Sequence, residues 1–231
     1  MLLMNVVEFI RKELCGWGKY ERIIFPAEII IIILLSLYMK DSKIALVSAI
    51  CGISYTILAG KGKISCYFFG LCGTLCYAFL SFKNNLFGNL CLYLLYYFPM
   101  QMFGIFKWKQ HLKKDCQEIV KTKLSTKERF VYYSLSLILS VVLYFILKYF
   151  HDQSPMIDAV TSVFSIVGLL LTVKRCIEQW HVWFVVNGLS TIMWINAYLH
   201  GSNCFATVIM WATYFVLAIY FLHCWRKEIK F

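Results

Sequence analysis

The chain has 231 residues, of which 61% are hydrophobic and only 15% are charged. Soluble domains carry about 25% charged residues, so the composition excludes an ordinary soluble protein and predicts an all-α polytopic membrane protein. The net charge of +11 does not indicate a nucleic-acid partner, because the basic residues gather in alternate connections between apolar runs, as they do in membrane proteins.

Eight apolar runs of about 17 to 21 residues predict eight transmembrane helices. In chain order they cover residues 23–39, 43–59, 64–82, 86–106, 130–150, 157–173, 180–199 and 204–224. A polar N-terminal segment, 1–22, precedes them, and the basic loop 107–129 divides them into four and four. The groups 43–106 and 157–224 each hold three spans joined by short turns, whereas 23–39 and 130–150 stand alone. This plan predicts two parallel three-helix repeats, with 23–39 as an extra helix. The span 130–150 is the linker, which gives the second repeat the same orientation in the membrane as the first.

Lysine and arginine are distributed very unevenly among the connections. The N-terminus, residues 60–63, 107–129 and 174–179, and the C-terminal tail together hold 19 of them, and the alternate connections hold four. By the positive-inside rule, both termini and the long loop are expected in the cytoplasm. The membrane itself is expected to be a bacterial inner membrane.

A gapless shift of 117 residues tests the predicted repeat. It overlays Trp108 on Trp225 and Tyr97 on Tyr214. The same shift places Gly70 on Asn187. The identities are few, and a composition as biased as this one would give about as many by chance. The spacing of the spans is therefore the main support for a repeat.

Trp180, Trp183 and Asn187 are the most informative residues, because offsets of three and four bring them onto one helical face. Two indoles and a carboxamide could stack a flat ring and hydrogen-bond its edge. The alternative is an aromatic belt at the membrane surface. A belt does not explain Asn187, which lies about 10 Å deeper than Trp180.

The fourth span carries a second polar stripe, in which Tyr97, Gln101, Gly104 and Trp108 follow one another at helical spacing. Gln101 could bind substrate with Asn187, or could simply bond a neighbouring helix. Two aromatic residues of the later spans, Tyr214 and Trp194, complete the candidate binding set. Trp108 and Trp225 adjoin basic residues and are expected to be interfacial anchors.

Motifs of catalysis are absent from the sequence: there is no nucleotide-binding loop, nucleophile elbow or zinc-protease motif. We therefore expect no enzyme, cofactor or metal site. Membrane-embedded acids are too few for ion coupling, which favours uniport. The ten cysteines lack metal-binding spacing and are expected to act as small hydrophobic residues. The five histidines lie at span ends or in loops, where solvation is the usual state.

Two other classes of function remain open. An intramembrane enzyme acting on a lipid or prenyl head group would need metal-binding acids or a nucleophile–base pair, which are not found. A structural or sensor protein would use its aromatic residues only for packing, and the deep polar stripes of the two halves argue against it.

The motif Trp-x-x-Trp-x-x-x-Asn (Trp180, Trp183, Asn187), Glu178 ahead of it, Asp158-Ala159 and the Gln101 stripe resemble the PnuC-type vitamin transporters over residues 25–226. That resemblance implies a fold like that of the sugar-transporting SWEET proteins, a homotrimer, and binding roles for Trp180, Trp183, Asn187 and Gln101. It also implies facilitated uptake of nicotinamide riboside, which a cytoplasmic kinase then traps. His181 departs from the pattern, so thiamine or riboflavin remains the alternative substrate.

Overall fold

A computed structural model of the chain describes residues 11–40, 42–83, 87–113, 118–151, 154–201 and 205–229. These residues form helices joined by short connections and a few isolated β-bridges. The chain divides into two compact units, Met1–Val120 (unit 1) and Lys121–Phe231 (unit 2).

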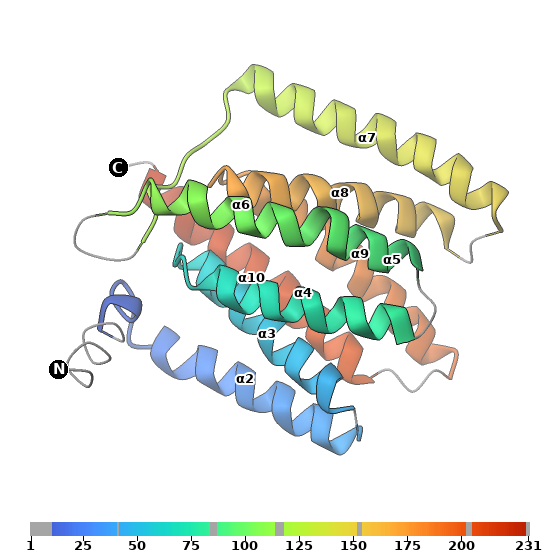
Figure 1. Cartoon of the computed structure of the whole chain (residues 1–231), viewed down its shortest axis with the longest axis horizontal. Helices are drawn as coiled ribbons and strands as arrows, with labels where there is room; N and C mark the ends of the chain where they lie inside the picture. Colours follow the sequence, from blue (N-terminus) through green and yellow to red (C-terminus); the bar gives the residue numbers. More distant parts are fainter. Residues whose placement is uncertain are drawn as a thin grey trace. The chain divides into compact units, whose positions relative to one another are not determined.

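Unit 1 contains the helices α2 (Glu21–Tyr38), α3 (Lys43–Gly60) and α4 (Cys66–Lys83), followed by α5 (Phe87–Leu92), the π-helical segment η1 (Tyr93–Tyr97) and α6 (Phe98–Lys109). Figure 1 shows α3 beside α4, the most extensive helix pair of this unit. The α2 helix packs on α3, and α6 packs on α4.

The π-helical segment has a local cause in the sequence. Pro99 has no N–H, so it cannot make the α-helical bond to the carbonyl four residues before it, and its ring crowds that carbonyl. The chain adapts just ahead of the proline, where the N–H of Phe98 bonds to the carbonyl of Tyr93, five residues back. Tyr93 and Tyr97 consequently stack with ring centroids 4.8 Å apart.

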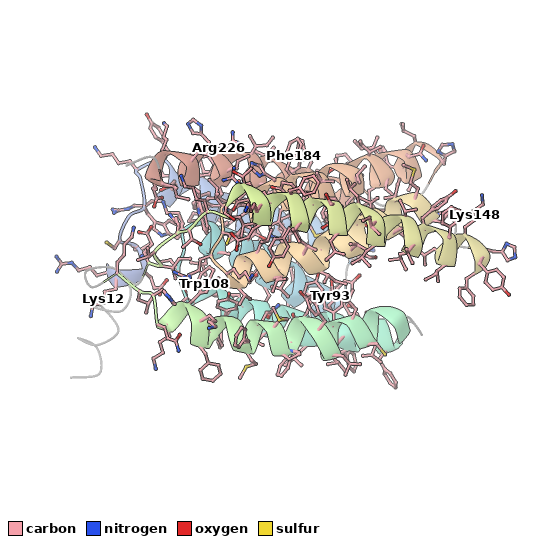
Figure 2. All side chains as sticks on the ribbon, turned by 90° about the horizontal axis from the view of Figure 1, so that it is seen from above. Lys12, Tyr93, Trp108, Lys148, Phe184 and Arg226 are labelled. Carbon is pink, nitrogen blue, oxygen red and sulfur yellow. The ribbon has the colours of Figure 1, made fainter. Side chains whose placement is uncertain are left out.

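Unit 2 contains α7 (Thr126–Tyr149), α8 (Pro155–Val173), α9 (Gln179–Leu199) and α10 (Phe205–Ile229). Each helix packs on the next one along the chain, so α7 lies on α8, α8 on α9 and α9 on α10 (Figure 1). Arg226 and Lys148 lie toward opposite ends of this unit (Figure 2). The end of unit 2 where α7 and α9 begin and α8 and α10 end is called the basic end below.

Six helices of the described residues are long and apolar enough to cross a membrane: α3, α4, α7, α8, α9 and residues Thr207–Ile229 of α10. The sequence predicted eight. The first predicted span corresponds to α2, which carries Glu21, Arg22 and Glu28. The fourth corresponds to α5, η1 and α6, which have 6, 5 and 12 residues. Each of these segments alone is too short to cross a membrane.

The connection before α7 is more structured than an unbroken loop over 107–129. In unit 1, α6 continues to Lys109. In unit 2, Ser125 caps α7, because its hydroxyl accepts a bond from the N–H of Glu128 while the Glu128 carboxylate accepts from the N–H of Ser125. This reciprocal capping box satisfies backbone donors that the first turn of a helix otherwise leaves unpaired.

The turn between α3 and α4 and the turn between α8 and α9 have the same backbone geometry. Each contains a residue with positive φ, Gly62 at 67° and Arg175 at 61°. In each, the next residue, Lys63 or Cys176, donates its N–H to the carbonyl five residues before it. The carbonyls of Gly62 and Arg175 also both accept a bond from the long connection. Gly62 of unit 1 therefore corresponds to Arg175 of unit 2.

The gapless shift of 117 residues is wrong at these turns, although it relates one important pair. Trp108 of unit 1 and Trp225 of unit 2 are both fully buried. Trp108 contacts Tyr67 edge to face at 4.9 Å, and Trp225 contacts Trp180 edge to face at 5.8 Å. Tyr67 and Trp180 are separated by the same number of residues as Gly62 and Arg175, whereas Trp108 and Trp225 are separated by 117 residues. The offset between the two units therefore changes between α4 and α6 in unit 1 and between α9 and α10 in unit 2.

Trp108 and Trp225 are thus not the interfacial anchors that their basic neighbours suggested. The indoles are the largest fully buried side chains of the described residues. Aromatic rings placed edge to face stabilise packing beyond the area that they bury. Among the described residues, seven cysteines are free thiols, as expected, whereas Cys15 is disulfide-bonded.

Candidate functional site

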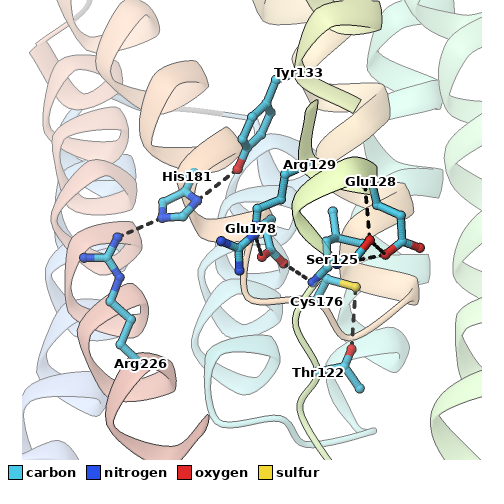
Figure 3. Close-up of polar contacts among 10 residues, drawn as sticks. Thr122, Ser125, Glu128, Arg129, Tyr133, Cys176, Glu178, His181 and Arg226 are labelled. Atoms are coloured by element: carbon cyan, nitrogen blue, oxygen red, sulfur yellow. Dashed lines mark hydrogen bonds and ion pairs between the residues drawn. The ribbon is translucent and has the colours of Figure 1, made fainter. Parts of the chain in front are cut away.

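The aromatic face of α9 begins beside a buried ion pair. Glu178, immediately before α9, is fully buried, and its carboxylate accepts bonds from Arg129 Nε at 2.7 Å and from the N–H of Leu124 at 3.1 Å (Figure 3). A buried carboxylate needs such partners, because leaving it unpaired costs several kcal/mol. Glu178 therefore ties the start of α7 to the start of α9, a role that the sequence did not indicate.

His181 lies in the first turn of α9 and is half-buried, not solvated as expected from its place at a span end. Its Nδ1 lies 3.0 Å from the hydroxyl of Tyr133 on α7, and its Nε2 lies 2.9 Å from a guanidinium nitrogen of Arg226 on α10 (Figure 3). One imidazole thus connects three helices of unit 2 at its basic end.

Trp180 is buried inside unit 2, where its ring packs against Phe221 at 5.2 Å and against Trp225. Its faces are therefore not open to an incoming ring in this conformation. Its indole Nε1 is buried and has no hydrogen-bond partner among the described residues. Buried donors are rarely left unpaired in proteins, so this N–H is a good candidate for a ligand contact.

Trp183 is half-buried and lies one turn further along α9. Its Nε1 donates to the hydroxyl of Thr172 at 3.3 Å, and its ring lies against Gly168 of α8, where an added Cβ would approach it to 3.0 Å. The absence of a side chain at Gly168 therefore leaves room for the indole of Trp183. Unit 1 has the reverse arrangement at the corresponding positions of its own helices, because Tyr55 of α3 packs against Gly70 of α4.

Asn187 is buried on the same side of α9, as its spacing from Trp183 predicted. Its Nδ2 donates to the backbone carbonyl of Tyr214 on α10 at 3.1 Å. This bond joins the two helices but uses only one of the four hydrogen-bonding sites of the carboxamide. Tyr214 is brought to α9 by this contact, whereas Trp194 lies seven residues further along α9, about 10 Å from Asn187.

Gln101 is the second buried carboxamide, and it lies in unit 1. Its Nε2 donates to the hydroxyl of Thr74 at 2.9 Å. Its Oε1 is buried and accepts no hydrogen bond from the described residues. A Cβ at Gly70 would lie 2.9 Å from this oxygen, so glycine leaves the space beside it. Tyr97 of the same unit belongs to the π-helical segment, one turn before Gln101.

The structure thus brings Trp180, Trp183, Asn187 and Tyr214 into one helix pair, α9 and α10, and Gln101 to Thr74 in unit 1. Polar groups within apolar helices that still have hydrogen-bonding capacity can recognise a small polar molecule with a flat ring. No cluster of three or more possible metal ligands occurs among the described residues. The fold and this site define a multi-pass helical membrane protein of the kind that transports small molecules.

Comparison with known proteins gives the family. The model of the family described as nicotinamide mononucleotide transporter matches residues 42–227, and the chain belongs to this family. Its relatives are PnuC-type transporters, so the resemblance carried by the Trp-x-x-Trp-x-x-x-Asn motif is confirmed.

Two curated relatives are named nicotinamide riboside transporter PnuC. The protein of Neisseria mucosa is 30% identical over 233 residues, which cover 99% of this chain and 89% of that protein. The protein of Haemophilus influenzae is 27% identical and covers 93% of both chains. A crystal structure of the vitamin B3 transporter PnuC has a TM-score of 0.80 and 30% identity, covering 95% of this chain and 96% of the other.

Proposed function

We propose that this chain carries nicotinamide riboside across the membrane by facilitated diffusion. The names of its relatives support this substrate. The observation in the chain itself that carries the proposal is the α9 face, where buried Trp180 and Asn187 flank the half-buried indole of Trp183. An indole can bind the cationic pyridinium ring of the substrate through a cation–π contact.

Each binding residue then has a defined role. Trp183 stacks on the ring, and Trp180 offers its Nε1 donor, since its faces are covered by Phe221 and Trp225. Asn187 and Gln101 bond the polar edge of the substrate. The uncommitted Oε1 of Gln101 suits a ribose hydroxyl, which is a donor. Tyr97, Tyr214 and Trp194 are proposed to line the path of the substrate.

Thiamine is the alternative substrate because it is also a flat cationic heterocycle. Purified protein can be screened by thermal shift against nicotinamide riboside, thiamine and riboflavin. A bound ligand stabilises the folded state by about 2.7 kcal/mol at a hundredfold excess over its Kd, whereas a molecule that does not bind has no effect. Stabilisation by thiamine or riboflavin alone would reject nicotinamide riboside.

Asn187→Leu tests the proposed site. The change removes a substrate partner and should cost binding about 1–3 kcal/mol, or about 5- to 150-fold in Kd. Asn196→Leu is the matched control, because Asn196 is an exposed carboxamide on the same helix. If both variants bind like the original protein while remaining folded, the site lies elsewhere.

Uniport is the proposed mode, since the sequence has neither a nucleotide-binding motif nor a chain of membrane-embedded acids. At zero membrane potential, vesicles containing the protein should equilibrate labelled substrate to equal concentrations on both sides. An imposed proton or sodium gradient should not change this end point. Accumulation driven by either gradient would establish coupling and reject uniport.

The proposed membrane arrangement has eight helices, with α2 and the α5–η1–α6 series added to the six apolar spans, and a SWEET-like parallel repeat in a bacterial inner membrane. The turn geometry shared by Gly62 and Arg175 supports a repeat. The 19-to-4 distribution of basic residues supports cytoplasmic termini, and the family resemblance suggests a homotrimer. A C-terminal reporter active only outside the cytoplasm should stay silent.

A further inference from the structure

A groove in unit 2 is lined by none of the residues assigned to the substrate. It has a volume of about 290 Å³ and is formed by α7, α8 and α9. Its lining consists of Tyr133, Leu137, Phe164, His181, Val182 and Val185. Leu137 is 59% exposed, so the groove is open on its α7 side.

The surface of the groove is almost wholly apolar, and its two polar side chains gather at one end, called the polar end below. Tyr133 and His181 lie nearest the starts of α7 and α9, and therefore toward the basic end of unit 2. Leu137 and Val185 each lie one turn further from that end. An elongated amphipathic molecule, with a polar head and an apolar chain, fits this polarity.

The charge of the basic end determines which head group is favoured. Residues 121–129, 174–179 and 225–229 contain eight lysines and arginines and three glutamates. Two of the three carboxylates are occupied, because Glu178 pairs with Arg129 and Glu228 with Lys121. Arg226 is exposed and bonds to His181, with no acidic partner among the described residues.

The hydrogen-bond chain at the groove also leaves one donor available. A guanidinium can only donate, so Nε2 of His181 must accept from Arg226 (Figure 3). The imidazole is then neutral with its proton on Nδ1, which donates to the oxygen of Tyr133. The hydroxyl proton of Tyr133 therefore remains available at the polar end of the groove.

We propose that this groove binds one acyl chain of an anionic phospholipid, whose phosphate is held by Arg226 and the hydroxyl of Tyr133. Anionic lipids are attracted to basic side chains at the membrane surface, and basic pockets between helices bind their head groups. A second copy of the chain, related by rotation about the membrane normal, would bring another basic end next to this one, and the like charges would repel. An anionic lipid is attracted to the same charges and is therefore the favoured occupant of the groove. This proposal does not depend on the transported substrate.

Native mass spectrometry of the full chain, released from detergent, tests the site. The probes are phosphatidylglycerol and phosphatidylcholine with identical acyl chains. We expect phosphatidylglycerol to remain bound and phosphatidylcholine to bind at least about fivefold more weakly, the factor for one basic side chain at an anionic membrane surface (~1 kcal/mol). Equal binding would overturn the proposal.

Two variants locate the bound lipid. Arg226→Gln should lower the affinity for phosphatidylglycerol about fivefold, whereas Lys227→Gln, which removes the neighbouring exposed charge, should leave it within twofold. Leu137→Trp should block the groove from its open side and abolish lipid retention. Leu139→Trp is its control, because Leu139 is 44% exposed on the same helix and does not line the groove.

Three outcomes would contradict the site. Equal effects of the Arg226 and Lys227 variants would show a nonspecific charge effect. Displacement of the lipid by an equal concentration of glycerol 3-phosphate would show a phosphate site without a role for the groove. A change in the mass of the assembly in Leu137→Trp, with lipid still bound, would show that a second copy covers the groove.

Discussion

Arg129→Ala is expected to destabilise unit 2 more than Glu178→Gln, although both changes remove the same ion pair. Glu178 is fully buried, whereas the side chain of Arg129 is 41% exposed. Without Arg129, the carboxylate keeps only the N–H of Leu124 and remains charged in an apolar setting. Without the carboxylate, Arg129 can turn toward water, and the amide oxygen of glutamine can still accept from Leu124.

The magnitudes follow from the partners that remain. Removing one member of a buried pair costs about 3–5 kcal/mol, and we take about 3 kcal/mol for Arg129→Ala because Leu124 still donates. Glu178→Gln replaces a charge-assisted bond by a neutral one and should cost about 1 kcal/mol. The double variant should cost far less than the sum of the two, a coupling of about 2 kcal/mol.

Thermal unfolding in detergent, followed by tryptophan fluorescence, measures these differences. For a chain of this size, 1 kcal/mol corresponds to about 2–4 °C in Tm, so Arg129→Ala should lower Tm by about 6–12 °C and Glu178→Gln by about 2–4 °C. The control is Lys113→Ala, which breaks an ion pair whose lysine is 46% exposed and should cost at most about 1 kcal/mol. Equal losses in the two single variants, with additive behaviour in the double, would refute this account of the pair.

Two further changes have expected outcomes in the same unfolding assay. Gly104→Ala should cost about 1–3 kcal/mol, because its Cβ would overlap the buried ring of Tyr67; an unchanged Tm would show that Tyr67 can move aside. Trp183→Phe should cost about 0.5–1.5 kcal/mol through loss of the bond to Thr172, while keeping a ring for the substrate, so a complete loss of riboside binding would show that the indole N–H has a direct role in recognition.

The sequence predicted those features of the structure that depend on residues close together within one helix. The spacing of Trp180, Trp183 and Asn187 predicted a shared helical face, and all three lie on α9. Pro99 lacks the N–H that an α-helix needs, and the π-helical segment ends two residues before it. The most specific part of the family resemblance was also a short motif on one helix, and the family match confirms the resemblance.

The environments of His181, Trp108 and Trp225 could not be read from their neighbours in the sequence. Each adjoins polar or basic residues at a helix end, which suggested solvent or a membrane interface. The structure places Trp225 against Trp180 and His181 between Tyr133 and Arg226. These contacts join different helices that are distant in the sequence, and they depend on which helices pack together.

The sequence by itself determined the membrane class, the helical character and the face of α9 that carries Trp180, Trp183 and Asn187, because hydropathy, charge and periodicity act within one segment. Only the tertiary structure decided which aromatic residues are covered, which polar atoms keep a hydrogen-bonding site for a ligand, and which charges are paired. The physical reason is that lipid and protein interior are both apolar. Hydropathy therefore places a helix in the membrane without showing which of its faces meets another helix.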